Sequence, residues 1–500
     1  MTAAGAPVAS RPPQAARRIG SGAVRLLRLE LRRSTLLSLL PLLAVLLAVT
    51  ELRNDLSHPP LWAVRSIDLQ VQAELTGAIV AGVAAWTAAR DGRRHLTDLV
   101  TATSRPRWAR QLASWAAVTS WALLFYAACV AVVFVATARQ ATWGGPIWWL
   151  PGVGAAAIVA FAAIGFAFGA FFPGRFSAPL VTVGALLAPQ IGVLALQRNL
   201  AWGRVTPARD ATVPGSGIFF PFHAGLSIVQ IMFLAGLTLT ALGALALPAA
   251  AGGRRLRRAG ALMALAGLAA AGTGVALAST ARLEAEGVII PALHAAASDR
   301  LIGYTPACDD SSVVPVCLHP AFRAQLPGLA AYLDPALSQV AGLPGAPVRV
   351  QFGAGTPQEV NGTIRIAGPA ISGHPPVLYL SPSLLVPGGA SVGQILGPAA
   401  PVTIIQTVIY GRQAPDGPAP SPAQQAVAAA LLKAAGVPLL APSAAGKRES
   451  GNGVPGPAPG SPAYAAARRF AALPAAARHA WLAAHLAALR DGRITLTEIP

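Results

Sequence analysis

Few residues of this chain have the types and spacing that catalysis needs. Gly446 and Lys447 have the order that ends a phosphate-binding loop, but Arg448 follows where a Ser or Thr would hold magnesium. The glycine that such a loop needs upstream is also missing. We therefore predict that the chain does not hydrolyse ATP by itself.

Histidines in the C-terminal part lack the spacing of a zinc helix. None of them forms a pair four residues apart, and His479 and His485 are six apart, which places them on different helix faces. We predict no enzymatic activity, no cofactor, and no catalytic, cofactor-binding or metal-ligating residue. Ligands that converge from distant segments, for example His319, His374 and His485, stay open.

The elements around these residues are dominated by apolar stretches in the first 280 residues. Each is close to the ~20 residues that a helix needs to cross ~30 Å of hydrocarbon. The second is the weakest, because Glu74 interrupts it, and we place Glu74 at a solvated helix end. The predicted spans are residues 34–50, 71–89, 112–136, 147–172, 176–196, 226–251 and 259–279.

The arginines between these stretches alternate in density. Eighteen lie in segments on the side of the N-terminus and six on the other side. Because arginine accumulates in cytoplasmic segments, we expect a multi-pass protein of a bacterial cell membrane with a cytoplasmic N-terminus. An odd number of spans then places residues 280–500 outside the cell.

Composition excludes some other classes. Hydrophobic residues make up 54% of the chain and charged residues 11%, against an average near 25% charged in soluble proteins. The net charge is +19, and sixteen of these charges lie in residues 1–280. The basicity therefore follows from membrane topology, and no nucleic-acid partner is expected.

The domain organisation follows from these patterns. We predict a disordered N-terminus (1–18), a transmembrane domain with seven spans (19–279) and an extracytoplasmic domain (280–500) with a Pro/Gly/Ser linker (446–462). Residues 19–33 form an amphipathic helix that lies along the inner leaflet. The fold class is thus an all-α polytopic membrane domain, a six-span core plus a seventh span, followed by a small α+β domain.

Short β-type runs and alanine-rich helical runs alternate in the C-terminal domain. Strands are predicted at 347–352, 363–366 and 377–380, with a turn at Asn361-Gly362, and helices at 423–435 and 475–490. Cys308 and Cys317 flank a polar segment in the part that we expect outside the cell. We predict that they form a disulfide, because an oxidising compartment permits pairing.

The longest cytoplasmic loop, residues 91–108, combines a short amphipathic helix, a proline turn and a basic, aromatic entry into the next span. With the helix before the first span and the long connection at 197–225, it resembles the permease subunits of actinobacterial type-2 ATP-binding-cassette exporters. The resemblance covers about residues 20–255 and rests on architecture. The seventh span and the exported domain depart from that family.

This resemblance implies a partner and a site. The loop would dock on a separate ATPase subunit, and two permease copies, identical or different, would form the translocation path in the lipid. Alternatively, its arginines only determine topology. The residues assigned to ATPase coupling are Asp91, Arg93, Arg94, Leu96, Leu99, Arg105, Arg107 and Trp108.

A weaker resemblance concerns residues 402–410, which are similar in context to the metal helix of gluzincin peptidases. Gln406, Thr407 and Tyr410 would stand at the His, Glu and His positions, and none of them can ligate zinc or act as the base. The resemblance implies an inactive peptidase fold kept for binding, and the alternative is an ordinary buried strand or helix.

Two functions follow from this sequence. The first is a transporter permease subunit with an extracytoplasmic accessory domain. The second is a membrane-anchored extracellular binding or regulatory module. Seven spans exceed what an anchor needs, which favours the first.

Overall fold

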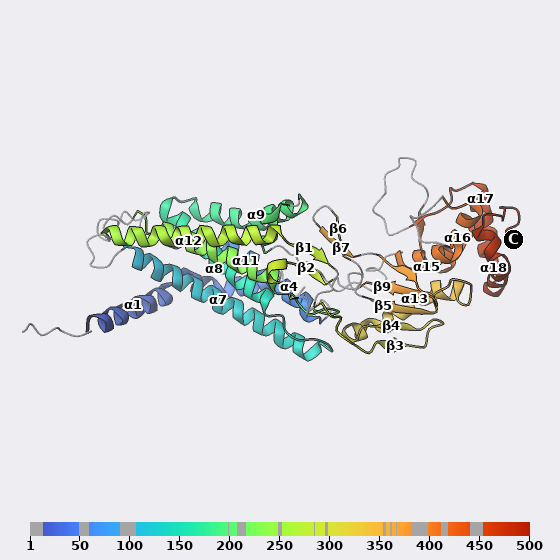
Figure 1. Cartoon of the computed structure of the whole chain (residues 1–500), viewed down its shortest axis with the longest axis horizontal. Helices are drawn as coiled ribbons and strands as arrows, with labels where there is room; N and C mark the ends of the chain where they lie inside the picture. Colours follow the sequence, from blue (N-terminus) through green and yellow to red (C-terminus); the bar gives the residue numbers. More distant parts are fainter. Residues whose placement is uncertain are drawn as a thin grey trace, which may run out of the picture.

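The computed structural model describes residues 14–49, 60–90, 107–198, 200–207, 217–248, 253–284, 286–295, 299–353, 357–360, 363–366, 368–381, 399–411, 419–440 and 454–500. A bundle of long helices is followed by a C-terminal region of short strands and helices (Figure 1). The last long helix ends at Ser279, and the first strand begins at Arg282.

Six helices of the described residues are long and apolar enough to cross a membrane, which makes this a membrane-protein fold. Their side chains are rich in Ala, Leu, Val and Gly, which suits an apolar environment, and the helical conformation satisfies the backbone hydrogen bonds within each segment. The six are α4 (Trp62–Ala88), α7 (Arg107–Gln140), α8 (Trp149–Phe171), α9 (Ser177–Gln197), α11 (Gly225–Ala244) and α12 (Gly253–Ser279).

The first predicted span differs from the prediction. It forms α2 (Thr35–Leu47), whose 13 residues cover only about 20 Å at ~1.5 Å each. Thus six helices reach the length of a span within the described residues, not seven. The amphipathic helix α1 (Gln14–Arg33) precedes α2 and packs on α7. The predicted disordered N-terminus, 1–18, falls mostly outside the described residues, and α1 begins before its end.

Side-chain contacts define the two ends of the bundle. At the first, here called the α1 end, Thr35 lies beside the end of α4, its Oγ1 3.3 Å from that of Thr87. At the second, the sheet end, Trp62 at the start of α4 contacts Phe134 near the end of α7, with ring centroids 5.4 Å apart. Thr35 and Trp62 therefore lie at opposite ends of the bundle. Figure 1 shows α1 and the C-terminal region at opposite ends.

Helix α4 lies at the centre of the bundle, where it packs against α7, α8 and α9. Gly165 and Gly169 of α8 face the backbone of Ala81 and Ala85, and a Cβ on either glycine would collide with those carbonyl groups. The small residues thus let α4 and α8 approach closely.

The same helix corrects the prediction for Glu74. Helix α4 begins at Trp62, nine residues before the predicted span, so Glu74 lies near the middle of the helix. Its Oε1 atom is buried. Polar residues in the first half of α4 hid this helical extension from a search for apolar runs.

The C-terminal region is built around a five-stranded mixed sheet with the order β3-β4-β5-β9-β8. The three central strands are parallel and both edges are antiparallel. Its strands are β3 (Ala307–Asp309), β4 (Val316–Leu318), β5 (Arg349–Phe352), β8 (Ala370–Ser372) and β9 (Val377–Leu380). Three two-stranded pairs complete the strands: β1 (Arg282–Glu284) with β2 (Gly287–Ile289), β6 (Pro357–Val360) with β7 (Thr363–Ile366), and β10 (Leu439–Leu440) with β11 (Val454–Pro455).

Helices of this region supply most of its apolar core. Fully buried side chains of α13, α15 and α16 pack with the central strands, for example Leu333, Ile404 and Val427. The helices are α13 (Leu326–Val340), α15 (Ala399–Tyr410), α16 (Pro422–Ala434), α17 (Pro462–Ala472) and α18 (Ala475–Arg490). Shorter helices are η4 (Pro291–Leu293), η6 (Pro320–Gln325) and, in the bundle, α10 (Ala201–Val205).

Most predicted elements of this region are present. Strands at 363–366 and 377–380 and the helix at 475–490 have the predicted bounds, and β5 and α16 are within two residues of them. The hairpin partner of β7 is β6, whereas β5 pairs with β4 and β9. Asn361 and Gly362 lie outside the described residues, as do residues 446–453 of the predicted linker at 446–462, whose remainder contains β11 and the first residue of α17.

The predicted disulfide between Cys308 and Cys317 is present. The two cysteines lie directly opposite each other on the antiparallel strands β3 and β4. The bond therefore closes a hairpin at the edge of the sheet.

Candidate functional site

Polar side chains are concentrated in the first half of α4, in what we call the α4 polar segment, Arg65–Thr76. The polar side chains of this segment form two rows along the helix. Neighbours in a row are four residues apart and lie on nearly the same face, because the α-helix has 3.6 residues per turn. Buried polar atoms without a hydrogen-bond partner in the described residues occur on Ser66, Gln70, Gln72, Glu74 and Thr76. An unsatisfied polar group costs several kcal/mol in a lipid-like interior, so these groups need a partner such as water, a solute, another chain or a part of this chain outside the described residues.

Arg65 in this segment has hydrogen-bond partners on a neighbouring helix. Its side chain is 1% exposed, and its guanidinium donates to Thr137 Oγ1 at 3.1 Å and to Gln140 Oε1 at 2.8 Å. Both acceptors belong to the last turn of α7. Arg65 therefore joins α4 to α7 at the sheet end, and its charged side chain has a structural role.

The predicted ATPase-coupling residues lie largely beyond the part of the chain that the structure describes. This holds for Asp91, Arg93, Arg94, Leu96, Leu99 and Arg105. Arg107 begins α7. Trp108 donates its indole N–H to Leu242 O at 3.3 Å, at the end of α11.

Both stems of the coupling segment are nevertheless placed at the α1 end. One stem is the end of α4, and the other is the start of α7. Helix α1 packs on α7, and Trp121 near the middle of α7 donates to Leu31 O of α1 at 2.9 Å. A cavity of about 30 Å³ lies between these helices, lined by residues that include Glu30, Arg33, Trp86 and Arg90. The segment thus leaves and enters the bundle beside the amphipathic helix.

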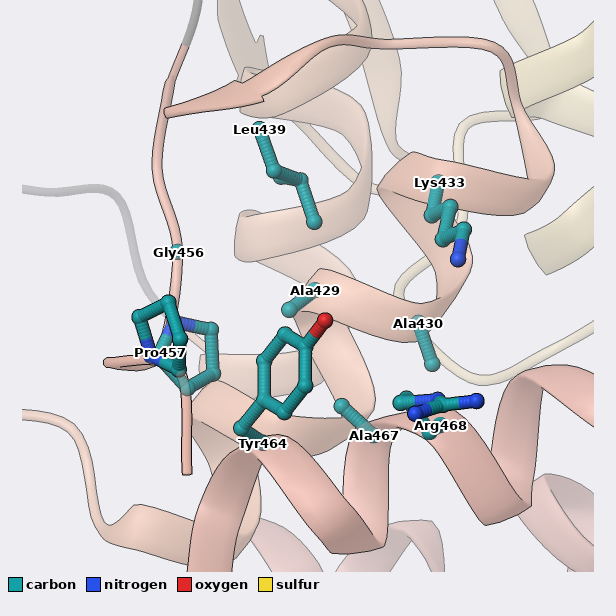
Figure 2. Close-up of a pocket in the computed structure, with 10 residues that line it drawn as sticks. Ala429, Ala430, Lys433, Leu439, Gly456, Pro457, Tyr464, Ala467 and Arg468 are labelled. Atoms are coloured by element: carbon teal, nitrogen blue, oxygen red, sulfur yellow. The ribbon is translucent and has the colours of Figure 1, made fainter. Parts of the chain in front are cut away.

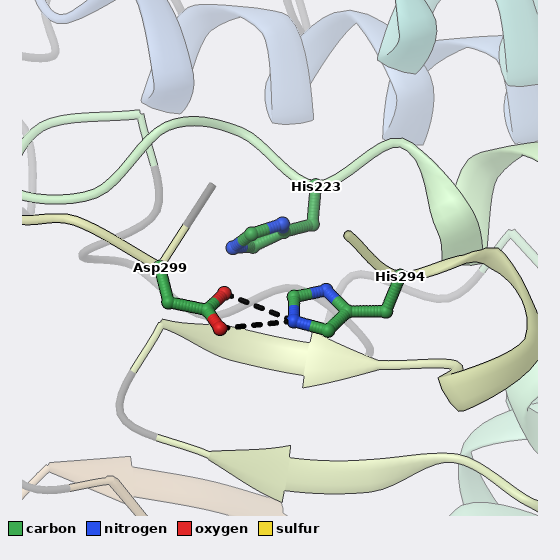
Figure 3. Close-up of side chains that lie close together, drawn as sticks. All are labelled: His223, His294 and Asp299. Atoms are coloured by element: carbon green, nitrogen blue, oxygen red, sulfur yellow. Dashed lines mark hydrogen bonds and ion pairs between the residues drawn. The ribbon is translucent and has the colours of Figure 1, made fainter. Parts of the chain in front are cut away.

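A cluster of metal-binding type lies at the sheet end and joins His223, His294 and Asp299 (Figure 3). His223 precedes α11, His294 ends η4, and Asp299 follows it. The potential ligand atoms all lie within 4.8 Å of one another. His294 Nε2 is 2.9 Å and 3.1 Å from the two carboxylate oxygens of Asp299.

The electrostatics of the cluster favour a neutral imidazole at His223. Burial lowers the pKa of His223, and the neighbouring His294 lowers it further, while Asp299 and Glu286 act in the opposite direction. A neutral ring nitrogen is the form that binds a metal ion. Sequence analysis missed this cluster because it considered only histidines after residue 280. The sequence did contain an indication of it: His223 precedes and His294 follows the last two predicted spans, which places both on the same predicted side of the membrane.

His319 is buried in an aromatic box between the bundle and the C-terminal region. Its ring contacts Trp143, Phe219 and Tyr304, and its Nδ1 accepts from Ala321 N at 3.2 Å. Burial lowers the pKa of His319 to about 4. This histidine therefore works as a packed core residue at the junction.

The convergence of His319, His374 and His485, which the sequence left open, does not occur among the metal-type groups of the described residues. His374 is exposed, and His485 stacks on Trp481 with ring centroids 4.8 Å apart. His479 hydrogen-bonds Ala341 O at 2.8 Å. His479 and His485 therefore make structural contacts within the C-terminal region.

The segment 402–410, which resembled a peptidase metal helix, is part of α15. Its Ile404, Ile405, Val408 and Ile409 are fully buried in the core of the C-terminal region. Gln406, Thr407 and Tyr410 lie on the partly exposed remainder of the helix. The helix is explained by its packing.

A separate cavity of about 190 Å³ lies between α16 and α17 (Figure 2). Its walls are mainly alanine, leucine and proline side chains, and Lys433 and Arg468 stand at one side. Tyr464 projects between them and Pro457. Such a site has room for a small apolar group with one negative charge.

No protein-family model, curated protein or solved structure matches this chain.

Proposed function

We propose that this chain is the membrane permease subunit of an ATP-binding-cassette transporter, with the C-terminal region as an accessory domain. The observation that carries the proposal is the position of α4. One end of this helix leads directly into the segment 91–106, and its other half is the α4 polar segment inside the bundle. A movement of the segment would act on the helix that carries the buried polar groups.

The polar groups fit a transport path better than a simple anchor. An anchor gains nothing from buried amide and carboxyl groups without partners, because their desolvation weakens the bundle. In a transporter, the same groups meet water or a solute, or face a second permease copy. The unsatisfied atoms of Gln70, Gln72 and Glu74 support this assignment.

The alternative is a membrane-anchored extracellular binding or regulatory module. A tethered module would need few contacts with its anchor. Instead, Leu61 and Val64 of the bundle belong to the same buried core as Phe322 and Leu326 of the C-terminal region. Thr142 Oγ1 also donates to Pro320 O at 2.8 Å. This continuity supports a domain that acts together with α4.

Arginine placement supports a cytoplasmic α1 end. The described arginines on helix termini at this end outnumber those at the sheet end, as expected for a cytoplasmic face. At the α1 end lie Arg25, Arg28, Arg32, Arg33, Arg90, Arg110, Arg175, Arg254, Arg255, Arg257 and Arg258, and at the sheet end Arg65, Arg139, Arg198 and Arg204. The proposal therefore includes an extracellular C-terminal region.

The docking experiment uses a candidate ATP-binding-cassette ATPase subunit from the same genome, co-expressed with the permease and purified through a tag on the full-length permease. The change Leu96→Asp should reduce the recovered ATPase at least about tenfold, because a docking helix depends on its apolar face. Leu301→Asp, at an exposed leucine of the C-terminal region, is the matched control and should leave recovery unchanged. Equal recovery with Leu96→Asp would mean that the loop only determines topology.

Topology is tested with single cysteines introduced in place of the exposed residues Arg28 and Arg468, in intact cells. A membrane-impermeant maleimide should label position 468 and spare position 28 until the cells are opened. The reverse pattern would overturn the orientation.

A further inference from the structure

We propose that His223, His294 and Asp299 form a binding site for a divalent transition-metal ion of the zinc class. The site lies outside the segments to which the proposed transport function is assigned. It is made by three residues whose side chains converge from separate parts of the chain (Figure 3).

The set of donors suits this class of ion. Two imidazoles and one carboxylate are ligands that zinc accepts, whereas calcium and magnesium prefer sites made only of oxygen. Tetrahedral ligands at ~2.0–2.1 Å from zinc are separated from each other by about 3.4 Å. His294 Nε2 and the Asp299 oxygens already lie 2.9–3.1 Å apart. His223 is within 4.8 Å of both, so a small side-chain movement completes the set.

The backbone that carries these ligands is held in place. Ile290 is fully buried in a small core with Leu226 and Val229 of α11, so the segment that carries His294 packs on the start of the helix that follows His223. Ile302 N also donates to Phe219 O at 2.8 Å, which ties the chain beyond Asp299 to the connection that carries His223. The ligands therefore need little ordering to bind an ion.

A nearby carboxylate offers a supporting group. Glu286 occupies the turn between β1 and β2, and its Oε2 atom is buried without a hydrogen-bond partner in the described residues. It is close enough to act on the charge of His223. Carboxylates commonly orient metal-bound imidazoles or complete the ligand set. A metal ion would thus also account for this buried acceptor.

The consequence of binding would be a clamp. His223 belongs to the connection before α11, and His294 and Asp299 belong to the chain after β2. An ion held by all three would fasten α11 of the bundle to the first segment of the C-terminal region. The simpler alternative is a His294–Asp299 ion pair that binds no metal.

The experiment uses the full-length protein in detergent, purified without a histidine tag, stripped with a chelator and then equilibrated with zinc. Metal analysis should find about one zinc per chain, and cobalt in its place should give the visible absorption of a tetrahedral ion. His294→Ala and Asp299→Ala should each weaken zinc binding at least about tenfold. His374→Ala, at an exposed histidine outside the cluster, should bind as the unchanged protein does.

Three results would overturn the site. The first is zinc well below one equivalent in the unchanged protein. The second is equal zinc binding by His294→Ala, and the third is an equal loss with His374→Ala. If His294→Ala does not give monodisperse protein, the cobalt spectrum of the unchanged protein decides, because without the site no tetrahedral absorption appears.

Discussion

The imidazole of His319 lies edge-on against the indole of Trp143, with ring centroids 4.7 Å apart and an angle of 86° between the rings. Trp143 follows the end of α7, and His319 precedes η6 in the C-terminal region. Two parts of the chain that the sequence separates by 176 residues are thereby joined, because aromatic rings in this geometry attract each other beyond their burial. This contact belongs to the junction between the bundle and the C-terminal region, whose stability can be tested.

The first prediction concerns pH. His319 has a pKa of about 4 in the folded protein and the ordinary 6.5 when unfolded, so the unfolded chain binds more protons between these values. Stability from this group is complete above about pH 6.5 and falls as the pH decreases towards 4, by on the order of 2 kcal/mol after allowance for solvent screening. Thermal unfolding at pH 7.5 and pH 5 should show a smaller difference for His319→Phe than for the unchanged protein. His374→Ala should retain the full difference, and equal differences in all three proteins would contradict the assignment.

A second prediction concerns Arg65, which joins α4 to α7. Arg65→Met should lower the free energy of unfolding by about 2–4 kcal/mol, because Thr137 and Gln140 lose a charged donor in a buried site. Arg300→Met, at an exposed arginine, should change it by less than about 0.5 kcal/mol. Thermal unfolding in detergent compares the two. If Arg65→Met is as stable as the control, the hydrogen bonds of Arg65 to Thr137 and Gln140 do not stabilise the bundle.

The close approach of α4 and α8 gives the third prediction. Gly165→Ala and Gly169→Ala place a methyl group against the backbone of Ala81 and Ala85, so the helices must separate. We expect a loss of about 1–3 kcal/mol for each change. Gly184→Ala in α9 has open space around its new methyl group and should be neutral or stabilising. If all three variants unfold at the same temperature, the tight packing is wrong.

The fourth prediction concerns the disulfide at the edge of the sheet. Replacing Cys308 and Cys317 with serine should destabilise the oxidised protein by about 2–3 kcal/mol, since the bond restricts the unfolded chain. A reductant should lower the unfolding temperature of the unchanged protein and leave that of the double variant unaltered. Cys129→Ala, at the cysteine outside this bond, should keep the sensitivity to reductant. A double variant that still responds to reductant would contradict the pairing.

The sequence alone was sufficient for the features that depend on local pattern. Long apolar runs specify helices because the backbone must satisfy its hydrogen bonds internally in lipid, and five of the six long helices largely coincide with predicted runs. Alternation and turn residues located β7 and β9, and the spacing of Cys308 and Cys317 in a polar segment indicated their bond. The four-residue spacing of Gly165 and Gly169 is typical of close helix packing, but the sequence does not identify the partner helix.

Tertiary structure decided what depends on neighbours distant in sequence. Helix α4 could extend to Trp62 only because the bundle surrounds its polar first half, and a hydropathy pattern cannot show that enclosure. The junction around His319 likewise required the ends of α4 and α7 to meet a sheet that begins after residue 300. His223, His294 and Asp299 come together through packing of α11 against the chain after β2, a contact that no local spacing encodes. Local propensity acts over a few residues, whereas sites of this kind are made where separate elements converge.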